Sequence, residues 1–351
     1  MKSSHLFLAA ALLLAPASGR ATEPAVKEPA PVENPVLARS RNAMVLTLLG
    51  TAGGPLARPD RAQPANLLLV DGSAYLIDAG EGTVRQLAKA GVTTGDLRAV
   101  FITHLHTDHT AGIPGLLMFR WSYLMAGMPL PALRLVGPPG TAEMTDGAVG
   151  FATWPTETLR AQAPKTPPVA AVAAAVNALP GVIYQDDKIK VTAVENTHYD
   201  AVALKEGPQG RHLSFSYRVD SRFGSVTFTG DTGPGKAVSD LARGSDLLVS
   251  EIIDIPPMAR FVARAASLPP GADKGIIAHM EREHLSPDAV ARIARDAGVK
   301  KVVLSHIANP DLDPVQTEAL GTGVSKGFDG PVVVGRDLLT LTVGAEAAPA
   351  P

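Results

Sequence analysis

The chain has 351 residues, of which 46% are hydrophobic and 19% are charged, so it can bury a core in one large domain or two. Its formal net charge of −2 excludes the strongly basic character of proteins that bind nucleic acid or anionic membranes through their overall charge. The chain has no cysteine, which excludes disulfides and leaves only nitrogen and oxygen ligands for a metal site.

Residues 1–21 have the pattern of a secretory signal peptide. Lys2 supplies the positive charge, an apolar stretch follows at 6–14, and small residues at 15–17 and 19–21 offer cleavage sites. The apolar stretch is too short for a membrane-spanning helix, and the alternative is a buried N-terminal helix. We therefore expect a periplasmic or secreted protein without stable membrane insertion. Removal of the leader takes away basic residues and no acidic residue, so the mature chain is more acidic.

The main folded domain is expected at 43–345, after a Pro- and Ala-rich linker at 22–42 and before a short tail at 346–351. Apolar runs bounded by turn residues predict strands at 44–49, 65–70, 74–78, 100–103, 133–136, 189–194, 213–219, 225–229, 247–250, 302–304, 331–334 and 338–343. Helices are expected at 83–90, 113–125 and 287–297. The Ala- and Pro-rich segment 145–182 is expected to form an inserted lobe with at least one helix. This alternation favours sheets covered by helices over an all-β sandwich.

The most informative segment is 104–109, which packs three histidines and an aspartate into six residues: His104, His106, Asp108 and His109. It follows a β-prone run at 99–103, and in an extended chain His104 and His106 point to the same side. Asp108 and His109 then begin the next turn and are free to face a second position. The cluster can therefore serve two metal ions, which favours a hydrolase.

Three further candidates follow predicted strands. His198 comes after 189–194, Asp231 lies between glycine and threonine after 225–229, and His306 comes after 302–304. A single histidine in such a place is more often an ordinary polar residue. Together with the first cluster, however, ligands on loops at one edge of a rigid sheet are typical of a built site.

This order of ligands in this strand context resembles the metallo-β-lactamase superfamily over nearly the whole mature chain. The resemblance implies an α+β fold, an αββα four-layer sandwich of two mixed β-sheets flanked by helices. It implies two divalent metal ions; the ligand types favour Zn²⁺, and iron or manganese would also suit them. One ion would take His104, His106 and His198, the other Asp108, His109 and His306, with Asp231 between them. Two adjacent ions can clamp the attacking and leaving oxygens of a displacement and activate water.

Other segments narrow the resemblance to the ribonuclease Z branch, which includes arylsulfatase-like and phosphodiesterase-like members. They are 49–55, 109–117, 230–234, 245–251, 284–286 and 304–306. By this resemblance Glu251 and His284 form a relay that protonates the leaving oxygen, and Asp108 is catalytic as well as a ligand. The alternatives are a surface acid for Glu251 and a helix-start partner for His284. Asp78 is expected to orient ligand groups, or else to be a simple turn residue.

The chain also departs from the tRNA-processing members of that branch. Those carry a basic arm that grips tRNA, whereas 145–182 contains Arg160, Lys165 and little else that is basic. RNA binding depends strongly on neutralising phosphates. The net charge and the leader therefore favour an exported enzyme for a small phosphodiester or sulfate ester, with no nucleic-acid partner.

Three alternatives stay open at this point. The first is a lactonase or β-lactamase on the same metal core, and the second is a metal-binding protein without catalysis. The third open point is the oligomeric state, which the sequence does not decide; a homodimer is one option. The segment 252–275 is either an apolar wall of the substrate pocket or a surface loop packed on the core. Of the remaining histidines, His279 is expected near His284 in the pocket and His212 on the surface.

Overall fold

A computed structural model describes residues 34–200, 205–208, 210–264 and 271–344 of the chain. The predicted leader, most of the predicted linker and the predicted tail lie outside the described residues, so these segments and the export that they imply stay predictions. The described part of the linker contains helix α1 (Pro35–Arg39), whose first turn is capped by the side chain of Asn34.

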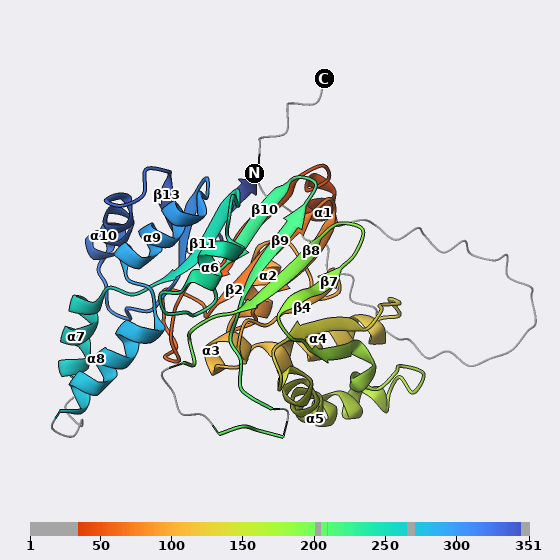
Figure 1. The fold of residues 1–351 in the computed structure, drawn as a ribbon. Coiled ribbons are helices and arrows are strands. Elements are labelled where there is room, and N and C mark those ends of the chain that lie inside the picture. Colours follow the sequence, from red (N-terminus) through yellow and green to blue (C-terminus); the bar gives the residue numbers. More distant parts are fainter. Residues whose placement is uncertain (1–33, 201–204, 209, 265–270, 345–351) are drawn as a thin grey trace, which may run out of the picture. The chain divides into compact units, whose positions relative to one another are not determined.

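Two mixed seven-stranded sheets form the centre of the structure (Figure 1). The first sheet has, in spatial order, β14 (Thr340–Val343), β1 (Met44–Gly50), β2 (Ala65–Val70), β3 (Ser73–Ile77), β4 (Leu97–Phe101), β5 (Leu133–Gly137) and β6 (Ala173–Asn177). The second has β13 (Val332–Val334), β12 (Val302–Ile307), β11 (Leu247–Ile252), β10 (Gly224–Phe228), β9 (Phe215–Ser221), β8 (Lys190–Glu195) and β7 (Gly181–Gln185).

Each sheet is antiparallel on one side and parallel on the other. In the first sheet the strands from β14 to β3 are antiparallel, and those from β3 to β6 are parallel. In the second, the strands from β13 to β10 are parallel and those from β10 to β7 antiparallel. The β2–β3 hairpin turns at Asp71 and Gly72, which both have positive φ, as the sequence of the turn predicts.

Side-chain alternation along the strands separates two layers of core. Along β2, Leu68 and Val70 point to the core between the sheets, where they join residues such as Phe215 and Tyr217 of β9. Leu67 and Leu69 point the opposite way, to the core beneath the helices of the first sheet. Both faces of these strands are therefore apolar, which explains why 65–70 is an almost continuous hydrophobic run.

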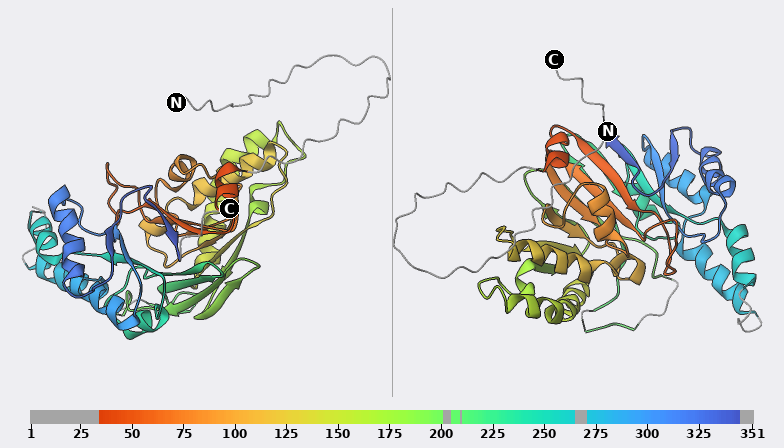
Figure 2. Two further views of the ribbon diagram at one scale, coloured as in Figure 1. Left: turned by 90° about the horizontal axis from the view of Figure 1, so that it is seen from above. Right: turned by 180° about the vertical axis from the view of Figure 1, so that it is seen from behind.

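Helices cover the outer faces of both sheets (Figure 2). On the first sheet lie α1, α2 (Thr83–Lys89), α4 (Ile113–Met125), α5 (Thr141–Arg160) and the 3₁₀ turn at Val169–Val172. On the second lie α6 (Lys236–Leu241), α9 (Pro287–Ala297) and α10 (Pro314–Ser325). This order of layers confirms the predicted αββα sandwich. No helix among the described residues is both long and apolar enough to cross a membrane.

The Ala-rich segment 145–182 is the part whose secondary structure was predicted least accurately from the sequence. It contains the expected helix, as the last part of α5, but its alanine run forms β6, which pairs with β5 in parallel. Alanine has no strong preference for a strand, so the pairing with β5 decides the conformation here. β7 then begins at the end of this segment and forms the opposite edge strand of the second sheet.

Candidate metal centre

The seven candidate ligands come from strand ends and loops of both sheets. His104 and His106 lie between β4 and the short helix α3 (Thr107–Thr110), which carries Asp108 and His109. The second sheet contributes the others: His198 follows β8, Asp231 follows β10 and His306 lies in β12. Side chains that are far apart in the sequence thus meet where the two sheets face each other.

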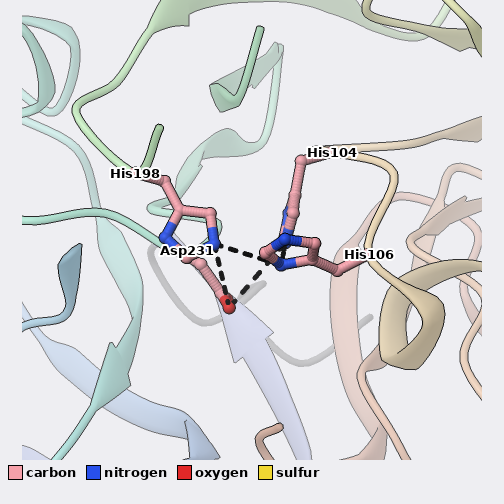
Figure 3. Close-up of side chains that lie close together, drawn as sticks. All are labelled: His104, His106, His198 and Asp231. Carbon is pink, nitrogen blue, oxygen red and sulfur yellow. Dashed lines mark hydrogen bonds and ion pairs between the residues drawn. The ribbon is translucent and has the colours of Figure 1, made fainter. Parts of the chain in front are cut away.

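A first group combines three imidazoles with one carboxylate (Figure 3). Nδ1 of His106 lies 3.0 Å from Nε2 of His104 and 3.2 Å from Nε2 of His198. Oδ2 of Asp231 lies 3.8 Å from the same nitrogen of His104 and 3.9 Å from that of His198. One ligand atom from each residue therefore faces a common point.

A second group shares Asp231 and adds Asp108, His109 and His306. Nε2 of His306 lies 3.1 Å from Oδ2 of Asp231 and 3.4 Å from Oδ2 of Asp108. Nε2 of His109 lies 3.3 Å from Oδ1 of Asp231 and 3.6 Å from Oδ2 of Asp108. Asp231 is thus the residue common to both groups, which is the place that the resemblance assigned to it.

The donor atoms of these groups fit divalent metal ions. Among the described residues, Nε2 of His109, Oδ1 of Asp231 and both ring nitrogens of His306 are buried without a hydrogen-bond partner. Buried polar atoms are normally paired, so an unsatisfied cluster of this kind calls for a ligand. Imidazole and carboxylate donors are the set that zinc and similar cations prefer.

A buried aspartate holds part of this cluster in place. Oδ2 of Asp78 lies 2.9 Å from Nδ1 of His109, and Oδ1 accepts hydrogen bonds from the backbone N–H and the hydroxyl of Thr103. That hydroxyl also lies 3.1 Å from Nδ1 of His104. Asp78 therefore orients one histidine of each group, and its left-handed backbone at φ 60° is consistent with a specialised turn.

Two further contacts position ligands that the sequence analysis had not linked to a partner. Nδ1 of His198 donates to the backbone carbonyl of Glu283 at 3.1 Å, which directs Nε2 to the first group. Gly54 donates its N–H to Oδ2 of Asp108 at 3.0 Å.

Neither Thr103 nor Glu283 was a candidate, although each directly precedes a predicted site residue in the chain. Gly53 leaves space for His306, because a Cβ at Gly53 would lie 2.6 Å from its Nδ1.

The electrostatics of the first group favour neutral imidazoles. Burial lowers the pKa of His104, His106 and His198, to about 3 for His198. A neutral ring keeps the lone pair that a metal needs. These three histidines are therefore ready to act as ligands at neutral pH.

In the second group, the nearby carboxylates determine the direction in which the pKa values of the histidines shift. Burial alone would lower the pKa of His306, but Asp231 and Asp108 raise it to about 10. Burial would likewise lower the pKa of His109, and Asp231, Asp78 and Asp108 hold it well above its usual value. Burial would raise the pKa of Asp108, but His109 and His306 lower it to about 2. The carboxylates of this group therefore favour positive charge at the position of the imidazole nitrogens, as they would favour a cation.

Glu251 and His284 form a pair beside the ligands. Oε2 of Glu251 lies 2.6 Å from Nδ1 of His284, and Oε1 accepts a hydrogen bond from the N–H of Thr232. Glu251 is 2% exposed and therefore not a surface acid. The ring of His284 lies next to those of His198 and His306, at centroid distances of 5.2 and 6.1 Å.

A cavity of about 620 Å³ opens onto this cluster. Its lining includes ligands of both groups and His284, together with apolar side chains from α7 (Ile255–Ala263) and α8 (Ala272–Glu283). Of the predicted apolar wall at 252–275, the residues Ile253, Met258 and Phe261 line the cavity. His279 lines the same cavity, as expected, and His212 is exposed on the surface.

Sequence comparison matches the β-lactamase superfamily domain to residues 73–307. The chain belongs to the metallo-β-lactamase superfamily. Curated relatives place it in the ribonuclease Z branch: the "Ribonuclease Z" of Mycobacterium bovis is 31% identical over 85% of this chain and 98% of its own length. That of Mycobacterium avium is 31% identical over 86% and 98%. The chain is accordingly a metal-dependent hydrolase of this superfamily.

Solved structures support the same fold. A metallo-β-lactamase fold protein from Bacillus subtilis superposes with a TM-score of 0.63 at 17% identity, over 86% of this chain and 100% of that one. Human tRNase Z, short form, superposes with a TM-score of 0.58 at 21% identity, over the same shares of the two chains. At these identities the likeness establishes the fold and leaves the substrate to the sequence relatives.

Two predictions from the sequence are wrong. We expected a small phosphodiester or sulfate ester, or else a lactone or β-lactam, and no nucleic-acid partner, whereas the relatives carry a name that designates an RNA substrate. The physical error lies in the charge argument, because a net charge sums over the whole surface while a bound substrate meets only the residues around one cavity. The comparisons give no support to export either, and the leader remains a prediction.

Proposed function

We propose that this chain is a zinc-dependent phosphodiesterase that hydrolyses RNA, as the name of its ribonuclease Z relatives suggests. The single observation that carries the proposal is the Glu251–His284 pair, placed beside the ligand cluster at the wall of an open cavity. An RNA phosphodiester has an alkoxide leaving group, and such a group needs a proton donor at this place.

The ligand sets divide between two ions in this proposal. His104, His106 and His198 would hold one, Asp108, His109 and His306 would hold the other, and Asp231 belongs to both groups of candidate ligands. When bound, the ions supply Lewis-acid stabilisation of the phosphate and lower the pKa of water. The oxygen and nitrogen donors and their unsatisfied state support this division.

The remaining chemistry belongs to side chains of the chain itself. Asp108 lines the cavity and orients the attacking water through its carboxylate. The water oxygen bonds to phosphorus as the water gives a proton to the Asp108 carboxylate, the bond from phosphorus to the leaving oxygen breaks, and that oxygen takes a proton from Nε2 of His284. Asp108 then releases its proton to solvent, and His284 regains one from solvent. Glu251 fixes the ring by holding Nδ1, so that Nε2 faces the cavity, and it stabilises the protonated form by its charge.

The experiment is cleavage of a labelled RNA hairpin with a single-stranded 3′ tail, of the tRNA acceptor type, by metal-loaded protein. We expect endonucleolytic cleavage of the RNA and loss of that activity with a chelator. Replacement of the exposed His212 by Ala is the matched control and should leave the rate unchanged. Absence of any RNA cleavage by protein with verified metal content would contradict the proposal.

A further inference from the structure

The cavity beside the ligand cluster is larger and more apolar than a phosphate group needs. Its volume of about 620 Å³ lies in the range of pockets that take a whole small ligand. Its lining includes the loop residues 53–56, among them the exposed Leu56, and side chains of the helical pair α7 and α8. Figure 1 shows this helical pair at the end of the molecule away from α5.

The side chains of α7 and α8 that line the cavity include one aromatic ring and two flexible methionines. Met258 and Val262 of α7 form a small core with Ile253, and Phe261 and Met280 pack on that core while remaining partly exposed. Phe261, Met258 and Met280 all line the cavity. Phe261 therefore offers an aromatic face, and the methionines offer polarisable surface, within reach of the candidate metal centre.

The imidazole of His279 adds a polar group to the same side of the cavity. Nδ1 of His279 lies 2.9 Å from Oε1 of Glu283, a carboxylate that is 2% exposed, whereas the His279 side chain is 47% exposed. The contact with Glu283 uses Nδ1 and leaves Nε2 of His279 for another partner, and His279 lines the cavity. An apolar surface with a small number of polar groups is typical of a site for a planar, partly polar ligand.

We propose that this pocket binds one unpaired nucleobase of the RNA, the base of a nucleotide that adjoins the scissile phosphodiester, stacked on Phe261. The inference rests on the proposed function and names the substrate feature that it requires. A base inside a duplex has both faces covered by its neighbours, whereas a base in a single strand can leave the stack and lie on an aromatic side chain.

The test compares an intact RNA with RNAs that have an abasic site on one or the other side of the scissile bond. Wild-type protein should show kcat/KM lower by about 5- to 150-fold for one of the abasic RNAs, the range expected for loss of one stacked base. Phe261→Leu keeps the apolar core and should lose most of this discrimination. Phe151→Leu, at a phenylalanine of α5 that is 63% exposed, is the matched control and should keep it.

A binding measurement makes the test independent of turnover. A non-cleavable phosphonate analogue with 2-aminopurine at the sensitive position should lose fluorescence on binding to the wild type and to Phe151→Leu, and much less on binding to Phe261→Leu. Equal cleavage of intact and abasic RNA by the wild type would overturn the pocket while leaving the proposed function intact. Equal discrimination by Phe261→Leu and the wild type would overturn the role of Phe261. Absence of RNA cleavage, with quenching retained, would refute the proposed function instead.

Discussion

Oε2 of the buried Glu251 lies 2.6 Å from Nδ1 of His284, and the ring of His284 lines the cavity that contains the candidate metal ligands. Because the carboxylate is itself held by the N–H of Thr232, it fixes both the position and the tautomer of the histidine. Burial would lower the pKa of His284, and Glu251 raises it above its usual value. The pair is therefore built to deliver a proton from Nε2.

Replacement of His284 by Ala should lower kcat for RNA by about 10²- to 10⁴-fold, the usual contribution of a positioned acid. A phosphodiester with a p-nitrophenolate leaving group should lose far less, because that oxygen leaves without protonation. Glu251→Gln, which keeps the hydrogen bond but removes the charge, should fall between His284→Ala and the wild type. Steady-state kinetics on both substrates measure this, and an equal loss on the two would contradict an acid role for His284.

Asp78 should control metal affinity although it is not itself among the candidate ligands. Asp78→Asn keeps the shape of the side chain but weakens the bond to Nδ1 of His109, so metal affinity should fall by about 10- to 100-fold. Competition with a chromogenic chelator measures the change. Asp240→Asn at the exposed Asp240 is the control and should bind metal as the wild type does. Unchanged affinity in Asp78→Asn would show that His109 needs no such partner.

Removal of metal should destabilise the whole domain, because the ligands join both sheets. At a free zinc concentration about 100-fold above the dissociation constant, binding adds about 2.7 kcal/mol to the free energy of unfolding. Calorimetry of loaded and chelator-treated protein should therefore show a lower Tm for the treated protein, and zinc should restore it. A Tm that is the same with and without zinc would argue against ligands that come from two sheets.

Asp186 joins the two sheets at another place and should make stability depend on pH. Its Oδ2 accepts hydrogen bonds from the hydroxyls of Tyr75 and Tyr184, and its Oδ1 from the N–H groups of Lys188 and Ile189. Burial would raise the pKa of Asp186, but these bonds, that of Tyr75 first, hold it below its usual value.

A lowered folded-state pKa means that the ionised Asp186 stabilises the fold above the unfolded-state pKa of about 4, and that this contribution disappears as the pH falls through the folded value. Asp186→Ala should therefore cost about 1–3 kcal/mol at neutral pH. Urea unfolding at several pH values should show the difference from the wild type shrinking below about pH 4. The exposed neighbour Asp187, replaced by Ala, should have little effect at any pH, and a pH-independent cost for Asp186→Ala would contradict the linkage.

Much of the fold and of the ligand cluster could be predicted because the signals are local. The helix at 113–125 and the strand at 65–70 have the predicted bounds. The segment 104–109 contains four candidate ligands within six consecutive residues. The downstream partners could be found because His198 and Asp231 follow strands and His306 lies near the end of one.

The parts that escaped prediction depend on tertiary contacts. The alanine run of β6 is a strand because β5 pairs with it, and nothing in its composition requires that. The support that Thr103 and the backbone of Glu283 give to His104 and His198 depends on distances across the fold. The substrate escaped because a net charge does not describe the surroundings of one cavity.

The central claim is that RNA cleavage depends on metal held by this ligand set. The most direct measurement titrates zinc into metal-depleted protein and follows RNA cleavage against the zinc bound per chain. The account predicts no cleavage without metal and a maximal rate at two equivalents. Full activity in protein that retains well under about 0.1 equivalents of metal, or none at two equivalents, would contradict it.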